Sequence, residues 1–258
     1  MNAAMERNKT MNYLLRVESL CKENILDKVT FNVEWGEMVA VMGPSGSGKS
    51  TLLYNIAGMD NPTSGGVWLG GSEITSMTED EKATVRLNQT GFVFQQMNMM
   101  KDLNIKDNIL LPAIHANKGK NGKNKKELAQ RAELLMNKLS VSEIGERSIS
   151  QVSGGQLQRA CICRSMMNEP LILFADEPTG ALNKSAAAEV MAEFEKLNNE
   201  GTTILMVTHD SKVASVCSRV LYLLDGKIYG EITLGKAMKG EERQREEKLN
   251  NWLSEMGW

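Results

Sequence analysis

The sequence predicts an α/β fold with buried parallel strands, an antiparallel strand pair at one edge and an inserted helical segment. Two kinds of pattern support this prediction. Short apolar runs at residues 38–42 and 171–175 are typical of strands buried on both faces. Residues 14–17 and 29–33 instead alternate or are β-branched, and we expect them to pair as an antiparallel edge beside the first buried strand.

Helical periodicity dominates the middle of the chain. Apolar residues recur at helical spacing over residues 105–116 and 126–139, and another helix is expected at 184–199. Residues 78–86 predict a short charged helix that opens with a capping box. The other expected elements are a helix at 49–56, strands at 65–70, 91–94 and 203–207, a hairpin of residues 220–224 and 227–232 around Asp225-Gly226, and a tail helix with Leu249, Trp252, Leu253 and Met256 on one face.

Composition excludes several classes of protein. The 258 residues allow one domain, or one domain with a subdomain, and the net charge of −2 argues against an extended nucleic-acid surface. No apolar run is long enough for a transmembrane helix and the N-terminal stretch lacks a signal-peptide core, so we expect a cytosolic protein, and docking on a membrane protein is left open. Two histidines exclude a multi-histidine metal site. The four cysteines are expected to be buried free thiols.

A phosphate-binding loop lies between the strand at 38–42 and the helix that follows it. Residues 43–50 fit the pattern G-x-x-x-x-G-K-[ST], and their glycines let backbone N–H groups turn toward a phosphate. We expect Lys49 to reach the β- and γ-phosphates and the Ser50 hydroxyl to ligate Mg²⁺. An ordinary glycine-rich turn is the alternative, which the flanking strand and helix disfavour. The nucleotide-binding residues expected here are Gly43, Pro44, Ser45, Gly46, Ser47, Gly48, Lys49, Ser50 and Thr51.

Acidic residues follow the apolar run at 171–175. Ligands of open α/β sheets bind at the carboxyl ends of the strands, where Asp176 and Glu177 lie. We expect Asp176 to hold Mg²⁺ through water and Glu177 to polarise an attacking water. His209 follows another strand in the same way, although a lone histidine is most often structural.

Ser153-Gly154-Gly155-Gln156 opens a helix that we expect to run to about residue 168. Ser153 and Gln156 form a capping box, which gives a purely structural explanation. Each glycine, however, weakens a helix by about 1 kcal/mol relative to alanine. Two of them are typical of a place where a ligand approaches bare backbone.

The ordered motifs resemble the ATP-binding subunit of ABC transporters. Five motifs carry the resemblance, and residues 13–233 fit it. They are GPSGSGKS, FVFQQ, VSGGQ, LILFADE and THD. The resemblance implies a P-loop NTPase core of the RecA-like type at residues 12–95 and 157–233. It also implies a helical subdomain at 96–156 and leaves an amphipathic tail at 234–258.

The same resemblance implies ATP and Mg²⁺ as cofactors and assigns further roles. Gln95 would sense Mg²⁺ and report to the membrane subunit, and His209 would contact the γ-phosphate. Ser153, Gly154, Gly155 and Gln156 would bind the γ-phosphate held by the other copy of a homodimer. The Mg²⁺ ligands would be Ser50, Gln95 and Asp176, and the catalytic residues Glu177, His209 and Gln95.

Within the family, residues 91–112 and 176–182 resemble the macrolide-export and lipoprotein-release group. The tail at 240–258 is similar to tails of the bacitracin and lantibiotic resistance branch. This implies an ATPase held by an FtsX-like permease at the cytoplasmic face of the membrane. A lipoprotein-release or cell-division ATPase, or a non-transport regulatory ATPase, is the alternative. Residues 97–100 are expected either at the permease docking surface or in the core, and the lysine-rich stretch 117–126 as a solvated loop.

Three positions depart from the family pattern. The motif VSGGQ at residues 152–156 corresponds to the signature motif of the family, with Val152 in place of the usual leucine and Ser153 to Gln156 as the signature residues. Asn183 replaces the usual aspartate of the segment called the D-loop. Residues 18–26 contain no ring, although an aromatic residue that stacks on adenine normally lies there. Asparagine caps a helix as well as aspartate does, so we expect the fold to be unaffected while a charge is lost.

Overall fold

In the computed structural model, which describes residues 13–117 and 124–258, the chain forms two units. The first unit comprises the described residues up to Ala83 together with Leu197–Trp258, and the second comprises Thr84–Lys196. Helix α3 (Glu79–Gln89) begins in one unit and ends in the other. The lysine-rich loop expected at 117–126 lies largely outside the described residues.

Strand β3 (Met38–Met42) is the centre of the first unit, and all five of its residues are buried. It pairs in parallel with β8 (Thr203–Val207) on one side and β9 (Arg219–Leu224) on the other. Strand β10 (Lys227–Thr233) pairs antiparallel with β9. Asp225 and Gly226 join them with positive φ at both positions, as the Asp-Gly turn signal predicts.

A second sheet in this unit has the order β2-β1-β4-β5. Strands β1 (Tyr13–Lys22) and β2 (Leu26–Glu34) pair antiparallel, which confirms that part of the prediction. Their expected place beside the phosphate-loop strand is wrong, because parallel strands occupy both edges of β3. The half-exposed burial pattern of β2 suits a sheet with one solvated face. Strands β4 (Ser64–Leu69) and β5 (Ser72–Glu73) complete it.

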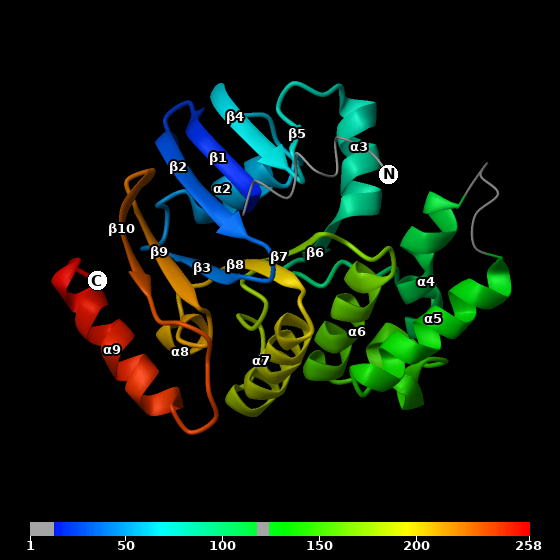
Figure 1. Cartoon of the computed structure of the whole chain (residues 1–258). Coiled ribbons are helices and arrows are strands. Elements are labelled where there is room, and N and C mark those ends of the chain that lie inside the picture. The colour runs from blue at the N-terminus through cyan, green and yellow to red at the C-terminus, as the bar shows by residue number, and fades with distance from the viewer. Residues whose placement is uncertain (1–12, 118–123) are drawn as a thin grey trace. The chain divides into compact units, whose positions relative to one another are not determined.

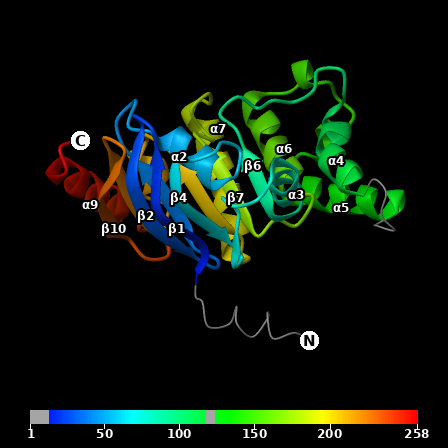
Figure 2. The same ribbon diagram turned by 90° about the horizontal axis from the view of Figure 1, so that it is seen from above.

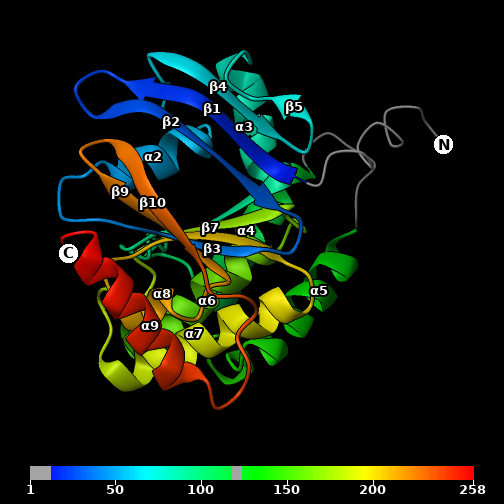
Figure 3. The same ribbon diagram turned by 60° about the vertical axis from the view of Figure 1, so that its left-hand side comes forward.

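Helix α2 (Lys49–Ile56) lies between the antiparallel sheet and the strands β3 and β9 (Figures 1 and 3). Leu52, Leu53 and Ile56 are buried, as the helical spacing predicts. The short helix α8 (Ser211–Ala214) is capped by Asp210, whose carboxylate accepts the Lys212 N–H at 2.8 Å.

The tail forms helix α9 (Glu242–Glu255) and packs on β9 and β10 (Figure 3). Leu249 and Leu253 are fully buried, and Tyr222 of β9 meets the rings of Trp252 and Trp258 edge-on at 6.3 and 6.0 Å. Arg245 anchors the helix by donating to the carbonyl oxygens of Ser215, Cys217, Leu234 and Gly235 at 2.8–3.0 Å. The tail is therefore an integral part of the first unit.

The second unit packs helices around two parallel strands, β6 (Thr90–Val93) and β7 (Ile172–Asp176). Phe92 contacts Phe94 and Phe174 at centroid distances of 4.3 and 6.3 Å. Figure 2 shows the helical part of this unit. Its helices are α4 (Ile105–Ala116), α5 (Lys125–Lys138), α6 (Gly154–Met166) and α7 (Lys184–Asn199), with short 3₁₀ turns at Ser142–Ile144 and Ile149–Gln151.

The elements expected from periodicity are present within one or two residues at most boundaries. Cys161, Cys163 and Cys217 are buried free thiols, as expected, and Cys21 is half-buried. No helix of the described residues is long and apolar enough to cross a membrane. The division into core, helical subdomain and tail stays a prediction.

We expect Arg245→Leu to lower the free energy of unfolding by about 2–4 kcal/mol, because it leaves buried carbonyl groups without a charged donor. Urea unfolding of the whole chain measures this change. The matched control is Arg243→Leu two residues away in the same helix, whose side chain is 92% exposed, and it should change stability by less than about 0.5 kcal/mol. Equal effects of the two substitutions would show that Arg245 does not anchor the tail.

Candidate functional site

The phosphate loop lies in the first unit, between the end of β3 and the start of α2. Gly43 is required by close approach, because a Cβ there would lie 2.0 Å from the Leu223 carbonyl oxygen. Gly48 has a φ of 97° and packs against Ile25 and Leu26. Gly46 has a φ of 83°, and a Cβ there would meet nothing within 4 Å. The loop is thus fixed at both ends and open at Gly46.

Polar groups of this loop suit an anion. Lys49 is buried, and its ammonium group donates to the carbonyl oxygens of Gly43 and Pro44 at 2.8 and 2.9 Å. The buried Ser47 hydroxyl has no hydrogen-bond partner. Gly48 is the N-cap of α2 and provides no side-chain cap for the first amides of the helix. An orphaned hydroxyl and an uncapped helix start fit phosphate oxygens.

A cavity of about 600 Å³ in the first unit reaches Gly46. None of its lining residues carries a ring: Cys21, Lys22, Glu23, Asn24, Ile25, Leu26, Asp27, Gly46, Thr63, Asp225 and Gly226. Tyr13, the alternative source of a ring, starts the ten-residue strand β1 whose other end borders this cavity. At about 3.3 Å per residue, Tyr13 lies some 25–30 Å away along the strand.

The acidic pair of the second unit ends strand β7. Asp176 is the last residue of the strand and is buried, and Glu177 is half-buried. Glu177 has a φ of 45°, a left-handed conformation that non-glycine residues adopt mainly at special positions. Such strain gathers at functional sites.

Gln95 and Glu177 converge on Gly180 within the second unit. A Cβ at Gly180 would lie 3.4 Å from Nε2 of Gln95 and 3.3 Å from Oε2 of Glu177. Gln95, two residues beyond β6, and Glu177, directly beyond β7, therefore share one small space beside the turn at 177–180. The Gly180 N–H closes this turn by donating to the Glu177 carbonyl oxygen at 3.0 Å. A carboxylate beside an amide group is an arrangement that can orient water or hold a divalent cation.

The expected capping box is present at the start of α6. The Ser153 hydroxyl accepts the Gln156 N–H at 3.3 Å, and the Ser153 N–H donates to the Gln156 side chain at 2.9 Å. Both glycines also have neighbours within the unit. A Cβ at Gly154 would lie 3.2 Å from Leu182, and one at Gly155 would lie 3.0 Å from the Cβ of Ala186. Close packing against the start of α7 thus gives a reason for both glycines besides ligand approach.

Asn183 caps helix α7. Its Oδ1 atom accepts the Ala186 N–H at 2.9 Å, which is the bond that an aspartate would make. His209 lies in the first unit, directly beyond β8, and its side chain is exposed. The predicted residues therefore divide between the units: the phosphate loop and His209 in the first, and Gln95, the signature residues and the acidic pair in the second.

Three polar residues near Gln95 were not expected from the sequence. Arg164 and Cys161 of α6 donate to backbone carbonyl groups of residues 97–98, and the buried Asn108 of α4 bonds to backbone groups of residues 100–104. No motif marks them, because each acts on backbone groups that carry no sequence signal. Among the described residues, no cluster of histidine, cysteine and acidic side chains could hold a metal ion by itself.

Comparisons with known proteins agree with this arrangement. The family pattern described as ABC transporter matches residues 26–180. The lipoprotein-releasing system ATP-binding protein LolD of Aquifex aeolicus is 41% identical over 224 residues, which cover 85% of this chain and 98% of the relative. The bacitracin export ATP-binding protein BceA of Halalkalibacterium halodurans is 39% identical over 217 residues, 84% of each chain.

Solved structures agree as well. The dimeric structure of the bacterial ABC transporter cassette MJ0796 matches with a TM-score of 0.78 and 36% identity, over 86% of this chain and 100% of that one. The same cassette in a post-hydrolysis state bound to ADP and Pi matches with a TM-score of 0.78 and 35% identity.

We expect this chain to bind ATP and GTP with dissociation constants within about tenfold of each other, because the cavity at Gly46 offers no ring to stack on a base. Base–aromatic stacking contributes about 1–3 kcal/mol, so nucleotide affinity should also be roughly tenfold to a hundredfold weaker than with a ring. Titration of both nucleotides measures this. A strong ATP preference that disappears in Tyr13→Ala would contradict the cavity as the base site.

Proposed function

This chain belongs to the ABC transporter family as an ATP-binding, ATP-hydrolysing subunit, and we propose that it powers a permease for export of, or resistance to, antimicrobial peptides or related amphiphiles. The observation that carries the ATPase assignment is the phosphate loop, with its constrained glycines, its buried Lys49 and the orphaned Ser47 hydroxyl. The peptide branch is supported by the bacitracin-export relative and by the ordered tail helix α9.

The loop residues 43–51 would hold the phosphates of ATP. Backbone amides around Gly46 and the ammonium group of Lys49 supply donors and positive charge there. Ser50, Gln95 and Asp176 would hold Mg²⁺, since hydroxyl, amide and carboxylate oxygens are the ligands this ion prefers. The bound ion would neutralise charge on the phosphates during hydrolysis.

Glu177 would act as the general base for the attacking water, and His209 would contact the γ-phosphate. Glu177 is half-buried beside Gln95, so its carboxylate is near a polar side chain that can help to orient a water molecule. Both side chains belong to turns that directly follow parallel strands, where the ligands of open α/β sheets bind.

We also propose a homodimer with ATP at its interface, in which Ser153, Gly154, Gly155 and Gln156 bind the nucleotide held by the partner copy. The dimeric cassette among the structural relatives supports this arrangement. A net charge of −2 argues against a nucleic-acid partner.

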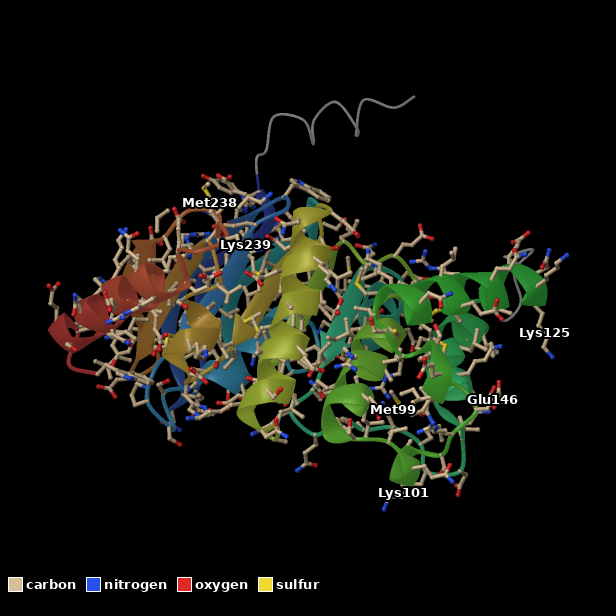
Figure 4. The ribbon with its side chains drawn as sticks, turned by 90° about the horizontal axis from the view of Figure 1, so that it is seen from below. Met99, Lys101, Lys125, Glu146, Met238 and Lys239 are labelled. Carbon is tan, nitrogen blue, oxygen red and sulfur yellow. The ribbon has the colours of Figure 1, made fainter. Side chains whose placement is uncertain are left out.

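The permease would be FtsX-like and would hold this subunit at the cytoplasmic face of the membrane. An exposed apolar row in the second unit suits such a contact: Met100, Leu111 and Ile114 are 52%, 40% and 46% exposed. The buried Asn108 holds the backbone of Met100, and Leu111 and Ile114, three residues apart, lie on the exposed side of α4. In Figure 4, the side chain of Lys101, the residue after Met100, projects away from the ribbon.

The second candidate is a lipoprotein-release ATPase, which the LolD relative favours. The two candidates differ in what stimulates hydrolysis by the complex with its permease. Bacitracin or a related peptide should raise the ATPase rate under the main proposal, and an acylated lipoprotein should raise it under the alternative. Stimulation by the lipoprotein alone would overturn the main proposal.

We expect Glu177→Gln to lower kcat by about 10²–10⁴-fold while ATP binding persists, because the general base is lost and the phosphate loop is intact. Steady-state hydrolysis and nucleotide titration separate the two effects. The same variant should form an ATP-dependent dimer, measured by sedimentation. Turnover within a few-fold of the parent would exclude Glu177 as the base.

The control for that dimer is Ser153→Arg in the Glu177→Gln background. A bulky cation at the signature should prevent ATP-dependent dimerisation but leave ATP binding by the monomer unchanged, because Ser153 acts on the partner's nucleotide. Normal dimerisation of this double variant would contradict a homodimer in which Ser153 binds the nucleotide held by the partner copy.

We expect Leu111→Glu combined with Ile114→Glu to abolish co-purification with the permease, because two charges replace the apolar row that it would bury. Leu134→Glu on α5 is the matched control, since Leu134 is 70% exposed and lies on another helix. It should co-purify normally. An unchanged melting temperature in both variants shows that the fold is intact, and retention of the permease by the double variant would exclude this row as the docking surface.

A further inference from the structure

The loop that carries Gln95 is bonded to helix α6 on both sides of that residue. Before it, the Ser165 hydroxyl donates to the Phe92 carbonyl oxygen of β6 at 2.7 Å. After it, Arg164 donates from Nη2 to the Met97 carbonyl oxygen at 2.9 Å and from Nη1 to that of Asn98 at 2.7 Å. One turn of α6 therefore brackets Gln95 through its backbone neighbours.

The hydrogen bonds to the residues after Gln95 come from side chains that stay protonated at neutral pH. Arginine stays charged at all physiological pH values, and its bonds to carbonyl oxygens are charge-assisted. The Cys161 thiol also donates to the Met97 carbonyl oxygen, at 3.2 Å. Burial raises the pKa of Cys161 to about 11, so the thiol keeps its proton at neutral pH. Asn98 has a φ of 47°, a conformation that asparagine tolerates better than most residues.

The other end of α6 carries the signature residues. Ser153 and Arg164 are eleven residues apart, which is about 16 Å along a helix at about 1.5 Å per residue. The N-terminal half is held to α7 by the Arg159–Glu189 ion pair at 2.7 Å and by the close contact of Gly155 with Ala186. A helix of this length transmits a displacement of one end to the other as a nearly rigid body.

Holding α6 to its neighbouring helix does not require Arg164 to contact the loop of Gln95. Arg131 of α5 makes the same kind of contact at the C-terminal end of α6, donating to the carbonyl oxygens of Met166 and Met167 at 2.7 Å each. It also pairs with Glu169 at 3.2 Å. Arg131 thus holds α6 to its neighbour without touching the Gln95 loop. The two arginines have the same chemistry and contact different segments.

We propose that Arg164 is a positioning residue for ATP hydrolysis, which fastens the loop of Gln95 to the helix that begins with the signature residues. A partner that displaces Met97 and Asn98 then displaces Ser153 as well, so that contact with the permease changes the site formed with the partner copy. This inference rests on the roles proposed above for Gln95 and Ser153. It adds the residue that connects them.

The first test compares Arg164→Leu with Arg131→Leu in the full-length chain. Both substitutions remove two charge-assisted bonds to carbonyl oxygens, and Arg131→Leu also removes the ion pair with Glu169, so we expect it to lower the melting temperature at least as much as Arg164→Leu. Only Arg164→Leu should lower kcat, by about tenfold or more, because small misplacements of catalytic groups have large kinetic effects. KM for ATP should change less than about twofold, since the phosphate loop is untouched. Equal kcat values for the two variants would overturn the proposal.

The second test measures coupling between the two ends of the helix. In the parent chain, Gln95→Ala and Ser153→Ala should have non-multiplicative effects on kcat. In the Arg164→Leu background, the two effects should simply multiply. Coupling that persists there would overturn the proposal, because a merely structural arginine would leave it unchanged. Arg164→Lys keeps the charge but cannot donate two parallel hydrogen bonds, so its kcat should lie between those of the parent and Arg164→Leu. If Arg164→Leu does not fold, Arg164→Lys takes its place in both tests.

The single variants separate this inference from the function on which it rests. If Gln95→Ala alone leaves kcat unchanged, the role proposed for Gln95 is wrong, and the positioning role fails with it. If Gln95→Ala is inactive while Arg164→Leu matches Arg131→Leu, only the positioning role of Arg164 fails.

Discussion

The phosphate loop can leave β3 as it does only because residue 43 has no side chain. The Leu223 carbonyl oxygen of the neighbouring strand β9 fills the space that a Cβ would need. At its other end the loop packs against Ile25 and Leu26 through Gly48. Lys49 is already held by two loop carbonyl groups. The donors are therefore arranged by the fold itself, and phosphate binding requires little further ordering of the backbone.

In the second unit, side-chain hydrogen bonds to main-chain groups fix the loops around α6. The start of α6 packs through two glycines against Leu182 and helix α7, and its last turns bond to backbone groups on either side of Gln95. Asn108 continues this pattern by bonding to Met100, Leu103 and Asn104. Side chains here bind main-chain groups, which fixes loop conformation regardless of loop sequence. The segment between Gln95 and α4 can thus present apolar residues such as Met100 to a partner and still keep its shape.

Most elements could be predicted from the sequence, because apolar periodicity is a local property. The motif spacings are local as well and mark candidate site residues, whose roles stay predictions. The sheet to which β1 and β2 belong could not be predicted from the sequence. Their residue pattern shows which faces are buried but not which strands pair with them. The contacts of Arg164 could not be predicted either, because its partners are carbonyl groups some 66 residues away in sequence. Gly154 and Gly155 suggested a ligand, while their nearest neighbours belong to the following helix and turn.

The departures from the family pattern fall where this chain can tolerate them. Asn183 keeps the helix-capping bond of the residue it replaces, so only a charge is lost. The missing ring leaves the cavity at Gly46 lined by charged, polar and aliphatic side chains, whereas the buried Lys49 and the orphaned Ser47 hydroxyl suit phosphates. Affinity would then come from the triphosphate and its cation, and the base would contribute little. A subunit of this kind would respond chiefly to the γ-phosphate, the group that distinguishes ATP from ADP.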